Sequence, residues 1–291
     1  MNRAVSKAAR IPRSPTPTYS SYTPHTSQRH FASRRPMDSP QSDIGVQVDQ
    51  ARVSEISANL HAIKARIESA CLKASLDTRP RLVAVSKTKP VADIMAAYTC
   101  GHCHFGENVS ELHDKAAHLP GDIKWHFIGH LQSNKCKVLA SIPNLHVVET
   151  IDGIKKADAM NKALAAWTRP LRVFVQVNTS GESSKGGVEP HDLLAVATHV
   201  LDKCPKLKLA GLMTIGAPEN GDKDPNPDFM TLQSCRDTVL ESHKDRSLSL
   251  ELSMGMSDDF ENAIKAGSTN VRVGSKIFGA RQYPNKQQQT P

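Results

Sequence analysis

The sequence lacks the features that mark several common classes of protein. Aromatic residues account for only 4% of its 291 residues, so a hydrophobic core has to be built mainly from aliphatic side chains. No apolar run approaches the roughly 20 residues that a membrane-spanning helix requires, so we expect a soluble protein without a membrane span. The Gly-rich stretch at residues 178–187 does not have the GxxxxGK[ST] spacing of a nucleotide-binding P-loop.

Acidic residues are absent from the first 37 residues, whereas basic residues are frequent there. This segment carries seven Lys and Arg residues, which account for nearly all of the formal net charge of +8. The rest of the chain has 30 basic and 29 acidic residues, so its charges almost cancel. A neutral body with few aromatic residues has no general electrostatic or stacking basis for binding nucleic acid.

Residues 1–45 are interpreted as a disordered extension that precedes the folded part of the chain. The segment is rich in Ser, Thr, Pro and Arg and poor in acidic residues, a composition typical of a mitochondrial transit peptide. The stretch RHFAS at residues 29–33 resembles a presequence processing site. We therefore expect a mitochondrial protein, with a disordered basic tail on a cytoplasmic protein as the alternative.

Six cysteines are present without a secretory signal, so disulfide bonds are not expected. Cys100 and Cys103 form a CxxC pair, and redox pairs of this kind open a helix, where the helix dipole lowers the thiol pKa. Here the order is reversed, because residues 91–99 predict a helix that ends just before the pair. A zinc site that adds His102 and His104 would need further spaced ligands that the sequence does not supply. We interpret both cysteines as ordinary thiols.

Hydrophobic periodicity predicts an α/β fold with a leading helix. Apolar residues spaced three and four apart, from Val53 to Cys71, form one face of a helix. Short apolar runs and helical stretches then alternate along the chain. The runs that predict strands are residues 81–87, 103–106, 124–130, 145–150, 171–178, 207–215, 248–254 and 270–275. The helices expected between them are residues 91–99, 108–118, 133–140, 152–166, 190–202, 226–242 and 258–266.

Strands that alternate with helices form parallel βα units, and eight such units favour closure into a barrel. We therefore predict a single (β/α)8 TIM barrel within residues 51–282, followed by a short polar tail at residues 283–291. An open, doubly wound sheet is the alternative. The barrel prediction directs the search for a functional site to the carboxyl ends of the strands.

Polar residues stand at most of these predicted strand ends, namely Lys87, Asn108, His130, Asn178, Thr214, Ser253, Gly274 and Ser275. Because side chains alternate along a strand, Phe174 and Arg272 are expected to point into the barrel. On the seventh strand the same alternation points Ser249, Glu251 and Ser253 inward. Polar residues are thus predicted to converge on the barrel mouth, which a purely structural barrel would not need.

Lys87 ends the first predicted strand, in the stretch RLVAVSKTKP. An amine held in a partly dry barrel mouth becomes a nucleophile toward carbonyl groups. The simpler alternative is a solvated lysine in a loop, which is how we interpret the neighbouring Lys89.

The turns after the seventh and eighth strands, Ser253-Met254 and Gly274-Ser275, lie where barrels of this type recurrently bind phosphate. Ser257 is interpreted only as the N-cap of the next helix. An amine and a phosphate cradle on one rim are what pyridoxal 5'-phosphate (PLP) requires.

Several stretches of the sequence resemble the pyridoxal phosphate homeostasis protein family, also called the proline synthase co-transcribed family. They are AVSKTKP, FGENVSEL, WHFIGHLQSNK, GLMTIG and LSMGMSDDFENAIKAGSTNVRVGSKIFGAR. The resemblance runs from about residue 51 to residue 282 and implies a barrel like the N-terminal domain of alanine racemase. It further implies that Lys87 holds PLP as a Schiff base, and that the other cofactor-binding residues are Asn108, Met213, Ser253, Met254, Arg272, Gly274 and Ser275.

Within that set, the resemblance implies that Asn108 and Met213 line the cofactor ring and that the two turns hold the phosphate. Arg272 would lie near the phosphate or the pyridine nitrogen. An arginine at that nitrogen would discourage its protonation and weaken the cofactor as an electron sink. The alternative for Arg272 is an ion pair with Glu251 inside the barrel.

The resemblance implies a protein that binds and delivers PLP inside the cell without an established enzymatic activity. Its partners would be PLP itself and apo forms of PLP-dependent enzymes, and the chain would be a monomer. The alternative is an amino-acid racemase or a related PLP enzyme. We expect no such activity, because the racemase resemblance stops near residue 282, where a second domain would supply the other acid/base group.

The transit-peptide interpretation can be tested with a fluorescent fusion of the whole chain. Deleting residues 2–33 should block import, because it removes most of the basic residues that such a signal needs. The measurement is the location of the fusion in cells by microscopy. A location unchanged by the deletion would contradict the interpretation.

Overall fold

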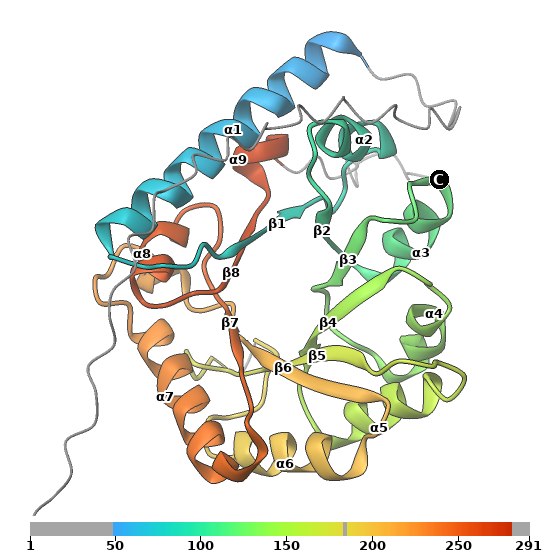
Figure 1. Cartoon of the computed structure of the whole chain (residues 1–291), viewed down its shortest axis with the longest axis vertical. Helices are drawn as coiled ribbons and strands as arrows, with labels where there is room; N and C mark the ends of the chain where they lie inside the picture. The colour runs from blue at the N-terminus through green and yellow to red at the C-terminus, as the bar shows by residue number, and fades with distance from the viewer. Residues whose placement is uncertain (1–48, 183–184, 281–291) are drawn as a thin grey trace, which may run out of the picture. The chain divides into compact units, whose positions relative to one another are not determined.

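The computed structural model describes residues 49–182 and 185–280. The proposed transit peptide and the polar tail lie outside the described residues. Within the described part of the chain, eight parallel strands close into one barrel in sequence order (Figure 1). Closure depends on β1, which pairs with β2 on one side and with β8 on the other. The barrel prediction is confirmed, and the open-sheet alternative is wrong.

The strands are short, as expected of a barrel of parallel βα units. Their bounds are β1 Arg81–Val85, β2 His104–Glu107, β3 Lys124–Phe127, β4 Leu145–Ile151, β5 Leu171–Gln176, β6 Leu207–Met213, β7 Glu251–Ser253 and β8 Asn270–Val273. The helices are α1 Gln50–Lys73, α2 Val91–Thr99, α3 Val109–His118, α4 Cys136–Ala140, α5 Ile154–Ala163, α6 Leu193–Lys203, α7 Pro227–Ser242, α8 Phe260–Lys265 and α9 Ser275–Phe278. Short 3-10 helices are η1 Ser133–Lys135, η2 Pro218–Asn220 and η3 Lys244–Arg246.

Helix α1 precedes the barrel and lies across its outside, against α2, α8 and α9 (Figure 1). Its predicted apolar face is buried and includes Ile56, Leu60, Ile63 and Ile67. Near the start of the helix, Arg52 donates hydrogen bonds to the Asp93 carboxylate at 2.7 Å and to the Phe278 carbonyl at 2.8 Å. The leading helix therefore ties the first βα unit to the last.

The apolar side chains of the strands form two layers, one between the strands and the helices and one inside the barrel, because side chains alternate along a strand. On β5, Val173 and Val175 belong to the large core between the strands and the helices. Phe174 lies between them in sequence but packs inside the barrel with Val147, Ala210 and Met213. The inward direction predicted for Phe174 is therefore confirmed, and the small inner cluster leaves room for polar residues in the rest of the barrel interior.

Strand β7 is shorter than predicted. It covers only Glu251–Ser253, and Ser249 is exposed rather than directed into the barrel. Ser253 pairs with Asn270, the first residue of β8, so the residues before Glu251 lie below the start of that neighbouring strand. Without a partner on that side they do not extend the strand, and the inward direction predicted for Ser249 is wrong.

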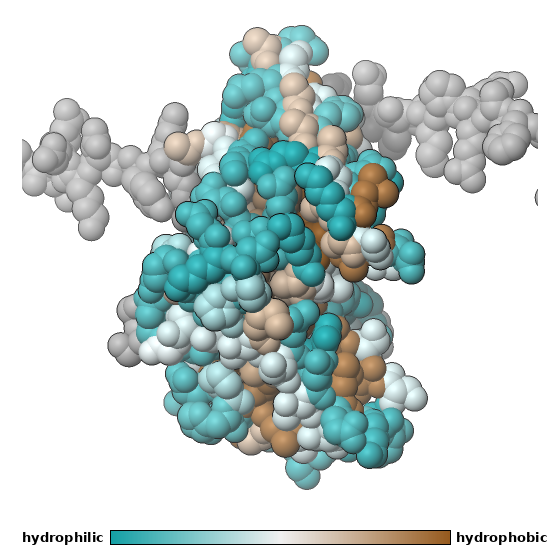
Figure 2. Space-filling view, turned by 90° about the vertical axis from the view of Figure 1, so that its left-hand side faces the viewer, coloured by the Kyte–Doolittle hydropathy of each residue, from teal (hydrophilic) through white to brown (hydrophobic). Residues whose placement is uncertain are grey.

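The outer surface is largely polar. None of the described helices is long and apolar enough to span a membrane. Figure 2 shows one face of the molecule, on which hydrophilic residues predominate and hydrophobic residues occur in small separate groups. Scattered exposed apolar residues of this kind are normal for a globular surface.

Gly211 marks the closest approach between β6 and β7. A Cβ atom at this position would overlap the backbone carbonyl of Glu251, to which the strand is paired. We expect Gly211→Ala to lower the free energy of unfolding by about 1–3 kcal/mol, because the two strands would have to separate. Gly121→Ala is the matched control, since a Cβ there meets nothing within 4 Å. Chemical denaturation should show a loss for Gly211→Ala alone; equal stabilities of the two variants would contradict the assignment.

Candidate functional site

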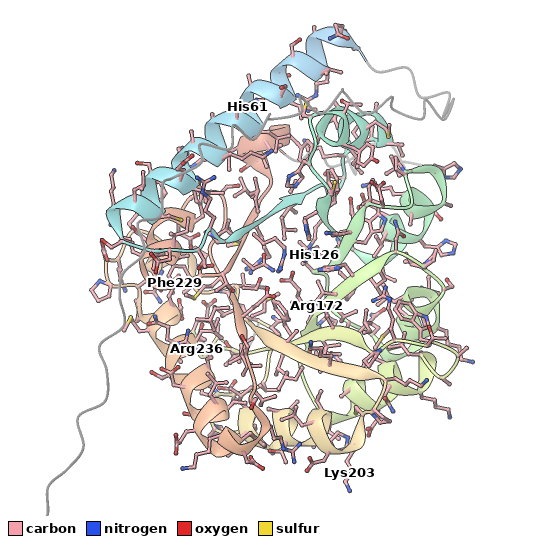
Figure 3. The ribbon with its side chains drawn as sticks, viewed as in Figure 1. His61, His126, Arg172, Lys203, Phe229 and Arg236 are labelled. Atoms are coloured by element: carbon pink, nitrogen blue, oxygen red, sulfur yellow. The ribbon has the colours of Figure 1, made fainter. Side chains whose placement is uncertain are left out.

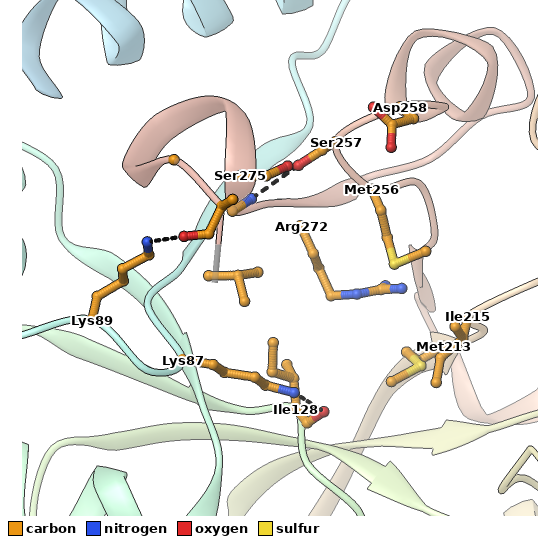
Figure 4. Close-up of a pocket in the computed structure, with 14 residues that line it drawn as sticks. Lys87, Lys89, Ile128, Met213, Ile215, Met256, Ser257, Asp258, Arg272 and Ser275 are labelled. Carbon is orange, nitrogen blue, oxygen red and sulfur yellow. Dashed lines mark hydrogen bonds between the residues drawn. The ribbon is translucent and has the colours of Figure 1, made fainter. Parts of the chain in front are cut away.

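A cavity of about 700 Å3 opens at the carboxyl ends of the strands (Figure 4). We call it the mouth cavity. The residues that line it are Val85, Lys87, Lys89, Ile128, Met213, Ile215, Met256, Ser257, Asp258, Arg272, Gly274, Ser275, Gly279 and Ala280. They come from the ends of β1, β3, β6 and β8 and from the turn after β7, which is where the barrel fold places functional residues.

Lys87 is half-buried and crosses one side of the mouth cavity (Figure 4). Its Nζ atom donates a hydrogen bond at 3.2 Å to the backbone carbonyl of Ile128, the residue that directly follows β3. Lys89 also lines the cavity, but its Nζ atom donates to the Ala280 carbonyl at 2.7 Å. The two lysines of the SKTK stretch therefore project to different parts of the rim.

The backbone on both sides of Lys87 is held by a buried ion network behind β1. The Glu107 carboxylate is fully buried and accepts hydrogen bonds from Ser86 Oγ at 2.7 Å and from Lys115 Nζ at 2.6 Å. Lys115 also donates to the Ser86 carbonyl at 2.9 Å. Burial raises the pKa of Glu107, while the charge and hydrogen bond of Lys115 act in the opposite direction. The residue before Lys87 is thus fixed through both its side chain and its carbonyl.

The residue after Lys87 is strained and is held by the same network. Thr88 has a φ of 65°, a conformation that is unfavourable for a β-branched residue. Its N–H donates to the Glu111 carboxylate at 2.7 Å, and Glu111 in turn accepts from Lys115 at 2.8 Å. The sequence reasoning missed this network. The four-residue spacing of Glu107, Glu111 and Lys115 was the available signal, since it places the last two on one helix face.

Arg272 points into the barrel from β8, as predicted. Its guanidinium donates to Ser253 Oγ at 2.6 Å and to the Thr214 carbonyl at 2.7 Å, and it also lines the mouth cavity. Burial lowers the pKa of Arg272, and the nearby charge of Glu149 opposes that effect. The predicted alternative, an ion pair with Glu251, is wrong.

Glu251 is occupied elsewhere. It is half-buried and forms ion pairs with Arg81 and Arg172. Arg172 and His126 both lie within the ring of strands in Figure 3. The carboxylate of Glu251 thus balances two other barrel arginines and leaves Arg272 facing the mouth cavity.

The turn after β8 forms another wall of the mouth cavity. Gly274 and Ser275 line it, as expected, and the Gly274 N–H donates to Ser257 Oγ at 3.2 Å (Figure 4). Ser257 is therefore part of the cavity. The prediction that it is the N-cap of the next helix is wrong. The N-cap of α8 is Asp259, whose carboxylate accepts a hydrogen bond from the Met256 N–H at 2.6 Å.

Of the eight residues predicted to bind a cofactor, the structure brings Lys87, Met213, Arg272, Gly274 and Ser275 together around the mouth cavity. The other three lie outside its lining. Ser253 and Met254 are fully buried; Ser253 Oγ accepts a hydrogen bond from Arg272, and Met254 packs in the large core. Asn108 is the N-cap residue of α3, and its side chain lies close to Gly129.

The barrel and its rim define the class of protein. The chain is a closed eight-stranded barrel with a half-buried lysine after the first strand. The family described as "Alanine racemase, N-terminal domain" matches residues 58–282, and the chain belongs to it.

Within that class, the chain is a member of the pyridoxal phosphate homeostasis protein family. It is 44% identical over 246 residues to the pyridoxal phosphate homeostasis protein of Homo sapiens, covering 79% of this chain and 88% of the human one. It is 50% identical over 202 residues to the protein of that name from Schizosaccharomyces pombe, covering 69% of this chain and 84% of its relative.

A solved structure of the PipY protein of Synechococcus elongatus, with PLP bound, has the same fold. PipY is 29% identical to this chain, with a TM-score of 0.65, and the match covers 77% of this chain and all of PipY. The predicted family membership and barrel type are both confirmed.

The ion network around Lys87 makes a clear prediction for stability. Lys115→Met should lower the free energy of unfolding by about 3–5 kcal/mol, because it leaves the Glu107 carboxylate buried without its cation. Chemical denaturation of the purified variants is the measurement. Adding Glu107→Gln to Lys115→Met should restore most of the loss, since the fully buried carboxylate is then gone and the Glu111 carboxylate that remains is partly exposed.

Lys137→Met on α4 is the matched control, because Lys137 is exposed. It should change the free energy of unfolding by no more than about 0.5 kcal/mol. If Lys115→Met cost no more than Lys137→Met, the buried network would not contribute as described.

Proposed function

We propose that this chain binds PLP in the mouth cavity, holds it covalently through the amine of Lys87 and serves its intracellular homeostasis and delivery. The observation that carries the proposal is the convergence of Lys87, Arg272 and the Gly274-Ser275 turn on one cavity. The PLP-bound state of PipY and the name shared by the curated relatives support it independently.

The residues present fit this cofactor. A cavity of about 700 Å3 lies within the usual range of ligand pockets, about 300–1,000 Å3. Its walls combine apolar side chains, suited to a pyridine ring, with hydroxyl and backbone groups suited to a phosphate. Gly274 allows the last turn to approach β1, because a Cβ there would lie 3.1 Å from the Val85 carbonyl oxygen. That close approach brings the turn beside the strand that ends in Lys87.

PLP, when bound, supplies an aldehyde that condenses with a primary amine, forming a carbon–nitrogen double bond and releasing water. Lys87 supplies the amine. The Ile128 carbonyl, 3.2 Å from Nζ, directs that amine across the cavity. The apolar side chains of Val85, Ile128 and Met213 line the same cavity.

The turns after β7 and β8 are best suited to bind the phosphate group of PLP. The hydroxyl groups of Ser257 and Ser275 and the backbone of Gly274 can donate hydrogen bonds to an anion without adding net charge. Arg272 adds a fixed positive charge close to this wall. Its two hydrogen bonds to Ser253 and the Thr214 carbonyl keep the guanidinium at the floor of the cavity.

We infer that the chain carries PLP rather than using it for turnover. Racemisation needs an acid/base group on each face of the substrate. Among the described residues that line the mouth cavity, none is a tyrosine or a cysteine, and the second lysine, Lys89, donates to the Ala280 carbonyl at the rim. A racemase or a related PLP enzyme remains the alternative function.

We further propose that the recipients are apo forms of PLP-dependent enzymes. The mitochondrion is the proposed compartment, on the composition of residues 1–45. Both proposals rest on the binding of PLP at Lys87, which is tested first.

Borohydride reduction tests the covalent attachment. The chain incubated with PLP should absorb visible light, and reduction should add one cofactor to the peptide that contains Lys87, because the half-buried amine faces the cavity. Lys87→Ala should lose essentially all of this adduct. Visible absorption and peptide mass mapping are the measurements.

Lys89→Ala is the matched control, since it removes the neighbouring lysine on the same rim. It should retain the adduct. An adduct that maps to Lys89, or that survives in Lys87→Ala, would contradict the assignment. Incubating the loaded chain with L- and D-amino acids then separates the two functions, since a carrier should leave the optical rotation of each amino acid unchanged.

A further inference from the structure

Three histidines meet inside the barrel, away from the mouth cavity. His104, His126 and His146 lie on the adjacent strands β2, β3 and β4. Their ring centroids are 5.2–5.3 Å apart in all three pairings. Each ring offers a nitrogen atom to the group, and these atoms lie within 4.8 Å of one another. Three imidazoles at such spacing converge on a common point.

The separations suit a tetrahedral transition metal. Bonds of about 2.0–2.1 Å from zinc to histidine nitrogen place two ligand nitrogens about 3.3 Å apart. His104 Nδ1 and His126 Nε2 are joined by a hydrogen bond of 2.9 Å, and one ligand nitrogen from each of the three rings lies within 4.8 Å of the other two.

A buried carboxylate orients the central histidine. Glu149 is fully buried, and its carboxylate accepts a hydrogen bond from His126 Nδ1 at 2.6 Å. That contact turns His126 Nε2 toward the other two rings. A carboxylate behind a histidine ligand is the usual outer partner of protein zinc sites, because it fixes the ring and raises its basicity. Its negative charge also offsets part of the charge of a bound cation.

The positive groups nearest the cluster are themselves balanced. Arg81 and Arg172 each form an ion pair with Glu251. Lys124 is exposed to solvent. The cluster is also accessible, since His104 lines a second cavity of about 680 Å3 together with Lys124 and residues of α1.

We propose that His104, His126 and His146 form a divalent transition-metal site of the zinc type inside the barrel, completed by a water molecule. The site would link three consecutive strands. It is independent of the mouth cavity in its ligands, because none of the three histidines lines that cavity. The CxxC cysteines near His104 are not needed for it, since the second and third ligands come from β3 and β4.

Calorimetric titration of the whole chain with Zn2+ tests the site. We expect one ion per chain. His146→Gln removes a half-buried ligand and should raise the Kd by more than the roughly 10- to 100-fold that loss of an outer partner costs. His199→Gln is the matched control, because His199 belongs to a second group of metal-ligand side chains, with Asp158 and Cys204. Tight binding that survives His146→Gln but is lost in His199→Gln would overturn the proposal, as would the absence of binding.

X-ray absorption of the zinc-loaded wild-type chain gives a second test that does not depend on any variant. The proposed site predicts nitrogen and oxygen ligands only, at about 2.0–2.1 Å. A sulfur ligand at about 2.3 Å would place the ion at Cys204 or another cysteine and would overturn the proposal.

Discussion

The pairing of β1 with β8 is the constraint on which the site depends. In this register Val83 lies opposite Arg272 and Ala84 opposite Val273. The strand that ends in Lys87 is therefore locked beside the strand that ends in the Gly274-Ser275 turn, although the two are far apart in sequence. The amine of Lys87, the guanidinium of Arg272 and the Gly274-Ser275 turn share one cavity only because the barrel closes. An open sheet with the same strands would leave its first and last edges unpaired.

Closure also encloses a polar network that most cores would exclude. Glu149 accepts hydrogen bonds from His126, Ser253 and Asn270 within the barrel. Burial alone would raise the pKa of Glu149, but the hydrogen bond from His126 and the charges of His126 and Arg272 hold it at about 2. This single carboxylate thus connects the floor of the mouth cavity, through Ser253 and Arg272, with the histidine cluster.

Much of this architecture could be predicted from local patterns. Apolar periodicity identified the leading helix and the eight strands, and alternation placed Phe174 and Arg272 inside the barrel. The wrong predictions concern features that depend on neighbouring strands and side chains. The inward direction predicted for Ser249 is wrong because the length of β7 depends on where β8 begins, which the sequence does not show. The alternative predicted for Arg272, an ion pair with Glu251, is wrong because Arg81 and Arg172 already occupy that carboxylate. The sequence does not show this.

The network around Lys87 could not be predicted for a related reason. Its members come from β1, β2 and α3, and only the packing of α3 behind β1 brings Lys115 to Ser86. The family resemblance predicts that Lys87 binds the cofactor, but the reason for its fixed position is visible only in three dimensions. A crystal structure of the chain grown with PLP tests the central claim most directly. The account predicts continuous electron density from Lys87 Nζ to the cofactor, with the phosphate against Ser257, Gly274 and Ser275. Density joined to Lys89, or a cofactor outside the mouth cavity, would contradict it.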